Sequence, residues 1–389
     1  MKSRIYLDHS ATTPVRPEVV AAMQPYWSEH AGNPSSLHSD GAAAKAALDA
    51  ARETVAEALG ATPVEIVFNG GGTEGDNQAL FGVAAALRER GRHIVSSAIE
   101  HHAVLNACRW LQSQGHEVTY VPVSAAGLVD PDAVARALRP DTVLVSIMLA
   151  NNEVGSIQPV RAIVDLAHAR GVLVHTDAVQ AIGKMPVRVD ELGVDLLALT
   201  AHKFYGPKGT GALYVRRGTP IEPTLYGGHQ ERGLRPGTQN MPGIVGLAEA
   251  LRLAVSECAH EATRLAGLRD RLQAGIASAI DDVVVNGDAA QRLPGILNVS
   301  FGRIDGESLL MALDLAGIAV STGSACASGA AEPSHVLTAL RLDPRYVTGS
   351  LRFSLGRSTT IDDIDQTLAV LREEIGRLRR LTGDAATCG

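Results

Sequence analysis

The sequence predicts an α/β protein in which a large domain, built around a mostly parallel β-sheet, carries a smaller α+β domain. Two observations lead to this prediction. Over about two hundred residues, apolar runs rich in β-branched residues alternate with Ala- and Leu-rich stretches of helical pattern. From about residue 243 the alternation gives way to one long helical stretch, short strands and a final helix. Apolar strands joined by helical crossovers are typical of parallel sheets covered by helices on both faces.

The alternating part of the chain contains six candidate strands and the helices that connect them. The candidate strands cover 65–68, 93–99, 142–150, 172–176, 196–200 and 211–217. Candidate helices follow the first four of these strands, at 75–90, 101–114, 160–171 and 178–183. Active sites of such sheets lie beyond the carboxyl ends of the strands, so polar residues at those ends are candidates for function.

The remaining part of the chain predicts the smaller domain. Its elements are a long helix at 243–280, short strands at 295–302 and 346–356, and a last helix from about 361 to 381. We expect a large domain over 15–255 and a small domain formed by 1–14 and 256–389. In this arrangement the opening residues return to the small domain across the surface.

Composition and charge exclude several classes of protein. The chain has 389 residues, 46% of them hydrophobic, which is enough for a large core and two domains. A formal net charge of -7 without any Lys/Arg run argues against direct nucleic-acid binding. No apolar stretch has the length of a signal peptide or a membrane span, so we expect a cytoplasmic protein that does not contact a membrane. The cysteines have no C-x-x-C spacing, which predicts neither disulfides nor a metal site and favours a reducing compartment: Cys108, Cys258, Cys326 and Cys388.

The stretch VFNGGGTEGDNQAL follows one candidate strand and begins a helix. Gly70, Gly72 and Gly75 satisfy the pattern G-x-G-x-x-G, so a dinucleotide site is one interpretation. The acidic residue that such a site places about twenty residues further on is not convincing. Three consecutive glycines followed by Thr73 fit a seat for a single phosphate equally well. A tight strand–helix turn without a ligand is the third interpretation.

Asp177 and Lys203 follow two successive candidate strands. The Asp177 carboxylate either caps the next helix or holds the protonated nitrogen of a pyridine ring, in which case Gln180 could reach the ring oxygen. Lys203 is either a solvated surface lysine or the partner lysine that pyridoxal phosphate enzymes require. Thr200 and His202 could add donors to a phosphate.

Two further strand ends carry polar side chains. An imidazole at His101 could stack on a planar cofactor and shuttle protons, or only cap a helix. Asn152, in ANNEVGSIQP, adds another polar group, with turn formation as its alternative. Together the strand-end residues fit a pyridoxal phosphate enzyme better than a dinucleotide-binding one. Separately, STGSACASGA places Cys326 among small residues, which predicts a mobile loop at about 321–335.

Ten blocks of the sequence occur in the order known from one enzyme family. They include YLDHSATTPV, GNPSSLH, GGTEGDNQAL, EHHAVL, HTDAVQAIGK, HKFYGPKGTGALYVR and GSACASGAAEPSHVL. On these blocks the chain resembles the NifS/IscS-type cysteine desulfurases, which are pyridoxal-phosphate enzymes of fold type I in the aminotransferase class V family. The resemblance implies a seven-stranded, mostly parallel sheet and pyridoxal 5'-phosphate as the cofactor.

The resemblance also implies roles for single residues around the cofactor. Lys203 would form the Schiff base, Asp177 would pair with the pyridinium nitrogen, and His101 would stack over the ring. Gln180 and Asn152 would lie near the ring hydroxyl. The residues implied to hold the phosphate are Gly72, Thr73, Thr200 and His202, with Thr238 reaching the phosphate of the other subunit of a homodimer.

The implied substrate is L-cysteine, whose carboxylate Arg352 would bind with Asn33 nearby. Lys203 would remove the Cα proton, and the Cys326 thiolate would take the sulfur as a persulfide and leave L-alanine. The sulfur would then pass to an acceptor protein of iron–sulfur cluster assembly or thio-modification. Cys388 is an incidental thiol or a second persulfide position.

Three alternatives to this function stay open at the level of the sequence. Within the same fold, a selenocysteine lyase or another class V enzyme would share most of the strand-end residues. A dinucleotide-binding oxidoreductase would use Gly70, Gly72 and Gly75 instead. A non-catalytic partner subunit that only keeps the fold is the third alternative.

Overall fold

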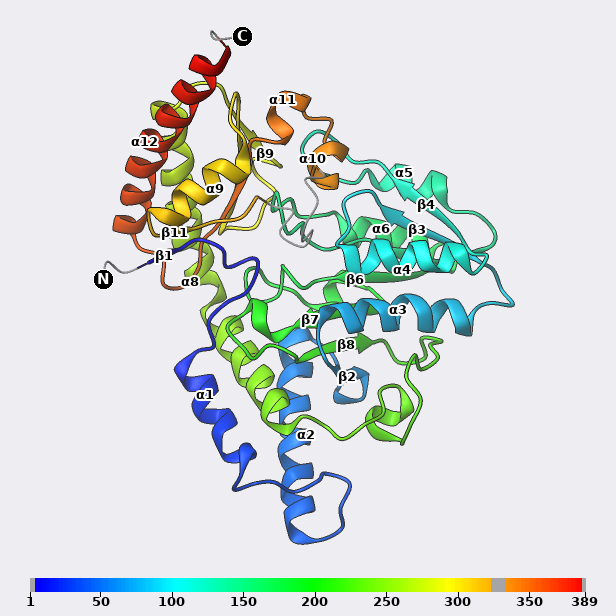
Figure 1. Ribbon diagram of the computed structural model, residues 1–389. Coiled ribbons are helices and arrows are strands. Elements are labelled where there is room, and N and C mark those ends of the chain that lie inside the picture. Colours follow the sequence, from blue (N-terminus) through cyan, green and yellow to red (C-terminus); the bar gives the residue numbers. More distant parts are fainter. Residues whose placement is uncertain (1–3, 323–332, 387–389) are drawn as a thin grey trace.

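The computed structural model describes residues 4–322 and 333–386 of the chain. Cys326, most of the predicted cysteine loop, and Cys388 lie outside the described residues. The described part contains a large sheet with helices on both faces, a smaller α/β unit beside it, and one long helix that runs through both (Figure 1). No helix in this part of the chain combines the length and the apolar character needed to cross a membrane.

The large sheet has seven strands, as expected from the family resemblance. All neighbours run parallel except at β8, which is antiparallel to the strand on each side of it. In spatial order the strands are β2 (Ile66–Asn69), β8 (Gly211–Val215), β7 (Leu196–Thr200), β6 (Leu173–Asp177), β5 (Thr142–Ser146), β3 (His93–Ser97) and β4 (Glu117–Val121). The edge strand β4 is missing from the six predicted strands, because its residues are mostly only half-buried and it lacks a continuous apolar run.

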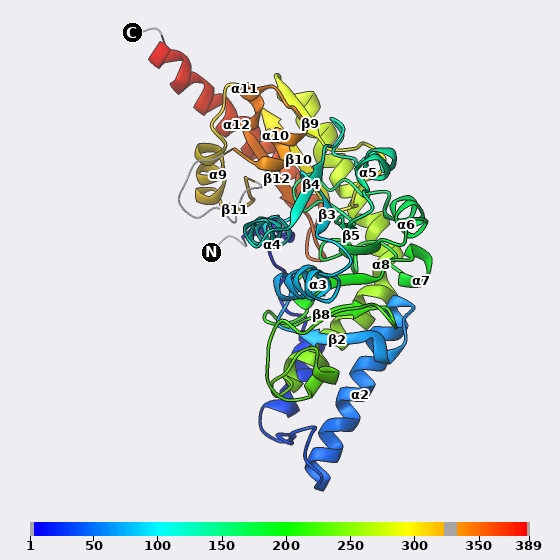
Figure 2. The same ribbon diagram turned by 90° about the vertical axis from the view of Figure 1, so that its right-hand side faces the viewer.

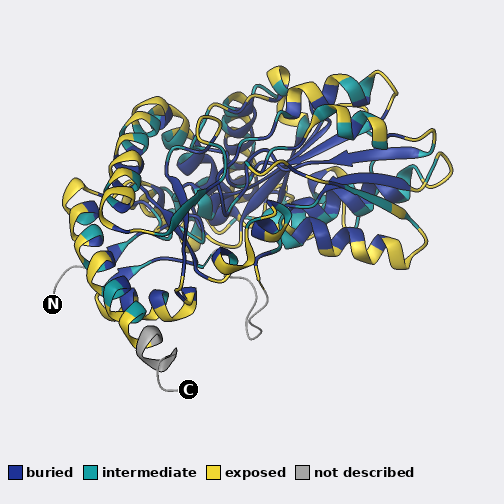
Figure 3. Ribbon diagram, turned by 90° about the horizontal axis from the view of Figure 1, so that it is seen from above, coloured by how far each residue is buried: buried dark blue, intermediate teal, exposed yellow. Residues whose placement is uncertain are grey.

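Helices cover both faces of this sheet, and the strands alternate their side chains between the two layers (Figure 2). Val67 packs with one layer, while its neighbours Ile66 and Phe68 pack with the other. One layer consists of α3 (Gly72–Ala86) and α4 (His102–Ser113). The other includes α2 (Ser39–Leu59), α5 (Pro131–Ala137), α6 (Val160–His168), α7 (Val189–Leu192) and the first half of α8 (Met241–Ala279). Buried strands between helices with exposed outer faces form the core of this part (Figure 3).

The smaller unit has its own hydrophobic core. An antiparallel sheet of order β12-β10-β9 packs against α8, α9 (Gly306–Leu315) and α12 (Ile361–Ala386). Its strands are β9 (Val283–Asn286), β10 (Ile296–Phe301) and β12 (Ser350–Ser354). Leu272, Phe301 and Phe353 lie at its centre and are fully buried. The short helices α10 (His335–Ala339) and α11 (Pro344–Val347) follow in the chain, but Val336, Leu337 and Val347 pack with the core of the large sheet. Helix α1 (Pro17–Met23) lies at the opposite end of α8.

The expectation that the opening residues cross the surface to reach the small domain is wrong. These residues are built into the small unit. Strand β1 (Ile5–Tyr6) pairs in parallel with β11 (Ile318–Ala319), and Leu7 is fully buried in the core of the small unit. The apolar residues of this segment alternate with polar ones, so each apolar side chain can enter the core while the backbone pairs with β11. The segment is therefore part of the fold and continues directly to the sheet edge where the site lies.

Two local predictions are also wrong. The helix predicted over 178–183 is absent, since residues 179–181, 183 and 184 form turns after β6. The strand predicted over 142–150 ends at Ser146.

The predicted domain boundary at residue 255 falls inside α8, which is helical from 241 to 279. The division of the chain into domains at that residue stays a prediction.

Candidate active site

A cavity of about 410 Å³ lies at the carboxyl ends of the parallel strands. It brings together ten of the predicted site residues, which come from both layers of the large sheet and from the smaller unit. These ten are Gly72, Thr73, His101, Asn152, Asp177, Gln180, Thr200, His202, Lys203 and Arg352. Ser10, Ala11 and Asp76 also line the cavity, and reasoning from the sequence assigned them no role.

One end of the cavity continues into a wider hollow at the N-terminus of α3. Gly70, Gly71 and Gly72 line this hollow together with Thr73 and His202. Gly71 has φ of 145°, a conformation that side chains disfavour. At Gly72 an added Cβ would lie 2.6 Å from Val179 Cγ2. The glycines are therefore needed for backbone conformation and close packing, and they leave the first N–H groups of α3 facing an open space suited to an anion.

Hydroxyl and imidazole groups add further donors at this end. His202 makes a hydrogen bond of 3.1 Å through Nδ1 with Thr12 Oγ1. Burial, reinforced by Lys203, lowers the pKa of His202 to about 4, so the ring is neutral at neutral pH and offers one N–H. Thr200 Oγ1 donates to the Thr210 carbonyl oxygen. The Thr73 hydroxyl, the His202 imidazole and the N-terminus of α3 fit a single phosphate group, and Thr200 would join them by releasing its bond to Thr210.

The middle of the cavity contains a buried carboxylate. Asp177 ends β6, and its Oδ1 accepts a hydrogen bond from Val179 N–H at 2.9 Å, within a turn rather than at a helix N-terminus. The helix-capping alternative for Asp177 is therefore wrong. Burial raises the pKa of Asp177. A cation beside this carboxylate would offset the free-energy cost of burying its charge. A buried carboxylate is in turn the partner that a protonated ring nitrogen needs.

Two more buried carboxyl groups lie near Asp177, and reasoning from the sequence missed both. Asp76 Oδ1 lies 3.5 Å from His175 Nε2, and it accepts no hydrogen bond from the described residues. Burial, with Asp177 and Glu100 nearby, raises the pKa of Asp76 well above its ordinary value. Burial likewise raises the pKa of Glu100 to about 8. At neutral pH Glu100 is therefore mainly protonated, and the raised pKa of Asp76 also favours its neutral form.

The Lys203 amine is held by the backbone of the N-terminal segment. Lys203 closes a short 3-10 helix, Ala201–Lys203, directly after β7. Its Nζ donates to the carbonyl oxygens of Ser10 at 2.6 Å and Ala11 at 2.8 Å. The two hydrogen bonds hold the amine within the cavity that Asp177 also lines. Backbone carbonyl groups orient the amine without adding a negative charge beside it.

The Gln180 side-chain amide has a defined orientation. Its Nε2 donates to the Ser10 carbonyl oxygen at 2.9 Å, and its Oε1 accepts from Lys184 Nζ at 2.6 Å. The Ser10 carbonyl oxygen can only accept, so it fixes the NH₂ group on its own side and leaves the amide oxygen on the side of Lys184. The second N–H of this group can donate to an oxygen in the cavity. Burial, with Lys203 adding to it, lowers the pKa of Lys184 to about 7.

His101 both caps a helix and lines the cavity, so the two interpretations of this residue hold together. Its Nδ1 accepts a hydrogen bond from Ala103 N–H at 3.1 Å at the start of α4. Burial and the nearby Lys203 lower the pKa of His101 to about 4, which keeps the ring neutral. Because Nδ1 accepts, the neutral ring carries its proton on Nε2.

Arg352 reaches the cavity from β12 of the smaller unit. Its Nη1 donates to the Asn152 carbonyl oxygen and its Nη2 to Asp8 Oδ1, each at 2.8 Å. The Arg352 side chain is only 3% exposed. A guanidinium fixed in this way can receive a carboxylate through its remaining N–H groups. Arg352 belongs to a different core from Asp177 and Lys203, so only the packing of the two units places it here.

Two of the predicted residues that the structure describes are not brought into the cavity. Thr238 and Asn33 are exposed and line neither hollow, and Asn33 Oδ1 accepts from Ser35 N–H. Cys326 lies outside the described residues. The residues that follow its segment are anchored beside the cavity, since Ser334 Oγ donates to Glu153 Oε2 at 2.6 Å and His335 Nε2 bonds the Glu100 carbonyl oxygen at 2.9 Å.

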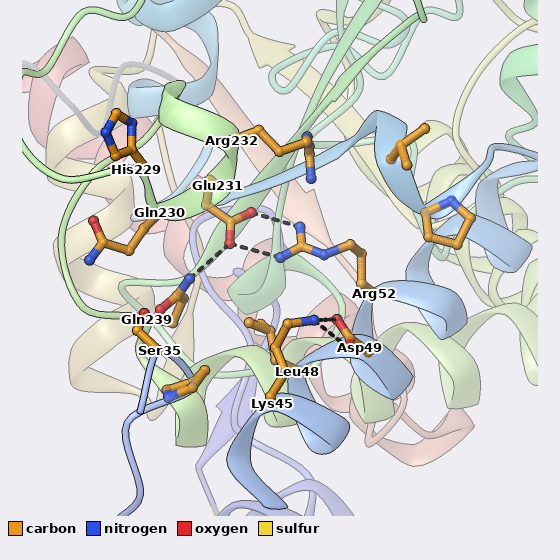
Figure 4. Close-up of a pocket in the computed structure, with 13 residues that line it drawn as sticks. Ser35, Lys45, Leu48, Asp49, Arg52, His229, Gln230, Glu231, Arg232 and Gln239 are labelled. Carbon is orange, nitrogen blue, oxygen red and sulfur yellow. Dashed lines mark hydrogen bonds and ion pairs between the residues drawn. The ribbon is translucent and has the colours of Figure 1, made fainter. Parts of the chain in front are cut away.

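The loop that carries Thr238 is anchored by a buried ion pair at a separate pocket of about 460 Å³ (Figure 4). Arg52 Nη1 and Nη2 donate to the two carboxylate oxygens of Glu231 at 2.7 and 2.8 Å. Glu231 Oε2 also accepts from Phe68 N–H. Glu231 itself has φ of 47°, an unfavourable conformation that these bonds hold in place.

Comparison with known proteins identifies the family. The family model for aminotransferase class-V matches residues 5–367. The chain belongs to the aminotransferase class-V family. Within this class-V family, it is 50% identical to the cysteine desulfurase IscS of Dictyoglomus turgidum, over 98% of this chain and 97% of the relative. It is 52% identical to the IscS of Methanosarcina thermophila, over 97% and 93% of the two chains.

Solved structures agree with this assignment. A NifS-like protein superposes with a TM-score of 0.91 at 41% identity, covering 96% of this chain and 99% of that protein. The predicted fold class and the resemblance to NifS/IscS-type cysteine desulfurases are therefore confirmed. These comparisons favour the desulfurase over the alternative of a dinucleotide-binding oxidoreductase built on Gly70, Gly72 and Gly75.

Proposed function

We infer that this class-V protein is a cysteine desulfurase that depends on pyridoxal 5'-phosphate. The observation that carries this conclusion is the single cavity in which Lys203, Asp177, His101 and Arg352 meet, in a chain about half identical to named cysteine desulfurases over nearly its whole length. An amine, a ring-nitrogen partner, a proton carrier and a carboxylate receptor are the groups that this chemistry requires.

The residues of the cavity fit the cofactor. Gly72, Thr73, Thr200 and His202 would hold its phosphate, and Asp177 would face its ring nitrogen. Gln180 would donate to the ring oxygen, with Asn152 nearby, and Lys203 would bind the cofactor covalently. When bound, pyridoxal 5'-phosphate supplies an electron sink for the substrate carbon.

Each protein group then has one task with the substrate. Arg352 binds the α-carboxylate of L-cysteine, and the Lys203 amine takes the Cα proton. The neutral His101 ring, whose Nδ1 accepts from Ala103 N–H, would donate a hydrogen bond from Nε2 beside the substrate. The thiolate of Cys326 attacks the substrate sulfur, so that the carbon–sulfur bond breaks as a sulfur–sulfur bond forms. The thiol proton of Cys326 ends on the methyl group of the released L-alanine, and Cys326 keeps the sulfur as a persulfide.

The persulfide would pass its sulfur to an acceptor protein of iron–sulfur cluster assembly or thio-modification. We also propose a homodimer, because Thr238 is exposed and does not line the cavity of its own chain. From there it can serve the phosphate end of a second copy. A reducing cytoplasm suits a protein whose reaction needs a free thiolate.

The test is the release of L-alanine and sulfide from L-cysteine by the purified holoenzyme in the presence of a reductant. We expect the two products in equal amounts, and we expect Cys326→Ala to abolish both. Cys108→Ala, which removes a buried thiol in α4, is the matched control and should keep the activity. Turnover of selenocysteine without any turnover of cysteine would contradict the proposed substrate.

A further inference from the structure

The turn from Asp8 to Ala11 connects the two sides of the cavity. Asp8 Oδ1 accepts a hydrogen bond from Arg352 Nη2 at 2.8 Å, while the carbonyl oxygens of Ser10 and Ala11 accept from Lys203 Nζ. Ala11 N–H donates back to the Asp8 carbonyl oxygen at 3.1 Å and closes the turn. This turn lies in the block YLDHSATTPV, to which neither the sequence patterns nor the proposed function assign a role.

The backbone of Asp8 is fixed independently of its side chain. The next residues pair with β12, where His9 N–H donates to the Ser354 carbonyl oxygen at 3.0 Å and Ser10 N–H donates to Ser354 Oγ at 2.9 Å. The Tyr6 hydroxyl donates to the Asp8 carbonyl oxygen at 3.1 Å. Arg352 lies on β12, the same strand as Ser354. The backbone pairing with β12 therefore places the Asp8 carboxylate beside the Arg352 guanidinium.

The bonds of Arg352 leave a suitable set of donors for a substrate. Its guanidinium has five N–H donors in one plane. One N–H of Nη1 goes to the Asn152 carbonyl oxygen and one N–H of Nη2 goes to Asp8. Each terminal nitrogen therefore keeps one N–H, and the buried Nε–H has no partner among the described residues, so the guanidinium retains donors for a carboxylate. Without the bond to Asp8, the guanidinium would be held at one terminal nitrogen only.

We propose that Asp8 is a positioning residue for substrate binding, whose carboxylate holds the Arg352 guanidinium in the orientation that receives the α-carboxylate of L-cysteine. This inference rests on the proposed function, since it assumes an amino-acid substrate. It makes Asp8 act through Arg352, without any contact of its own with the substrate.

The experiment compares two ligands of the holoenzyme that differ only in the carboxylate, L-alanine and ethylamine. Their dissociation constants are measured from the change in visible absorbance of the bound cofactor. We expect Asp8→Ala to weaken L-alanine binding roughly tenfold, the size expected for the loss of one charge-assisted hydrogen bond. Ethylamine binding should change less than about twofold, because an amine without a carboxylate does not use Arg352.

Matched variants separate positioning from a structural effect. Asp8→Asn keeps an oxygen that can accept the same bond, so it should recover most of the lost L-alanine affinity. Asp314→Ala removes another ion pair of the N-terminal segment, with Arg4, and should leave both dissociation constants unchanged. In an Arg352→Ala background the effect of Asp8→Ala should disappear. If Asp8→Ala does not fold, as judged by thermal unfolding, Asp8→Ser takes its place.

Three outcomes overturn the inference. Equal weakening of L-alanine and ethylamine would mean that Asp8 only supports the cavity. Tighter binding of L-alanine by Asp8→Ala would mean that Asp8 competes with the substrate for Arg352. A wild-type holoenzyme that neither binds L-alanine nor releases it from L-cysteine would instead contradict the proposed function itself.

Discussion

Lys203 Nζ lies 2.6 Å from the carbonyl oxygen of Ser10 and donates a hydrogen bond to it. The two residues are 193 positions apart, and they meet because the N-terminal segment packs across the carboxyl ends of the strands. A backbone carbonyl orients the amine but adds no charge, so the amine can leave it to react. This contact makes the opening segment part of the active site.

Lys203 can be tested by removing its amine. We expect Lys203→Ala to lower kcat by about 10²–10⁴-fold, the range for loss of a positioned acid–base group. The visible absorbance of the purified protein should change as well, because the cofactor loses its lysine. Lys45→Ala, which removes an exposed lysine paired with Asp49, is the control and should keep both properties. A Lys203→Ala protein with wild-type kcat would show that another base acts.

Asp177 can be tested by removing its charge and keeping its shape. We expect Asp177→Asn to lower kcat about a hundredfold or more, because an amide cannot balance a protonated ring nitrogen. The pH dependence of the cofactor absorbance should shift at the same time, which a purely structural loss would not cause. The measurement is a pH titration of the absorbance beside steady-state rates with L-cysteine, and unchanged curves would contradict the assigned role.

The buried pair Arg52–Glu231 should be important for stability. Removing one partner with Arg52→Ala leaves a buried carboxylate without its counter-ion, and we expect a loss of about 3–5 kcal/mol in the free energy of unfolding. The exposed pair Lys45–Asp49 borders the same pocket, and Asp49→Ala should cost about 0–1 kcal/mol (Figure 4). Denaturant unfolding of both variants measures the difference, and similar losses would show that burial does not matter here.

Glu100 should make stability depend on pH. Its pKa is raised to about 8 by burial, so the protonated carboxyl stabilises the folded state at low pH. This contribution is complete below the unfolded pKa of about 4.3 and is lost as the pH rises to about 8. We expect Glu100→Gln to unfold at a higher temperature than wild type at pH 9 and within about a degree of it at pH 4. A constant difference between the two proteins from pH 4 to 9 would contradict this explanation.

Thr238 can be tested by mixing subunits. If it serves the partner's cavity, a hybrid of Lys203→Ala and Thr238→Val subunits contains one site with both changes and one site with neither. Mixed and reassembled subunits should then be more active than the mean of the two parent variants. Activity equal to that mean would place Thr238 in its own chain's site or outside any site.

Several features of the site were predictable from local sequence alone. Asp177, Lys203 and the glycine turn before Thr73 each follow a strand directly, and in a parallel sheet those positions meet at one edge. The turn glycines are also set locally, because Gly71 needs a conformation that other residues disfavour. The ten cavity residues that the sequence predicted are of this kind or were implied by the family resemblance.

Contacts between distant segments were decided only by the tertiary structure. Asp8, Ser10 and Lys184 carry no local pattern of a functional residue, yet they orient Arg352, Lys203 and Gln180. Asp76 and Glu100 became an acidic cluster around Asp177 only because packing excludes water from all three. Alternation and turn chemistry act over a few residues, so the sequence by itself determined the fold class and the strand-end residues. Burial and long-range hydrogen bonds depend on which segments pack together, and they determined the charges and the orientations within the site.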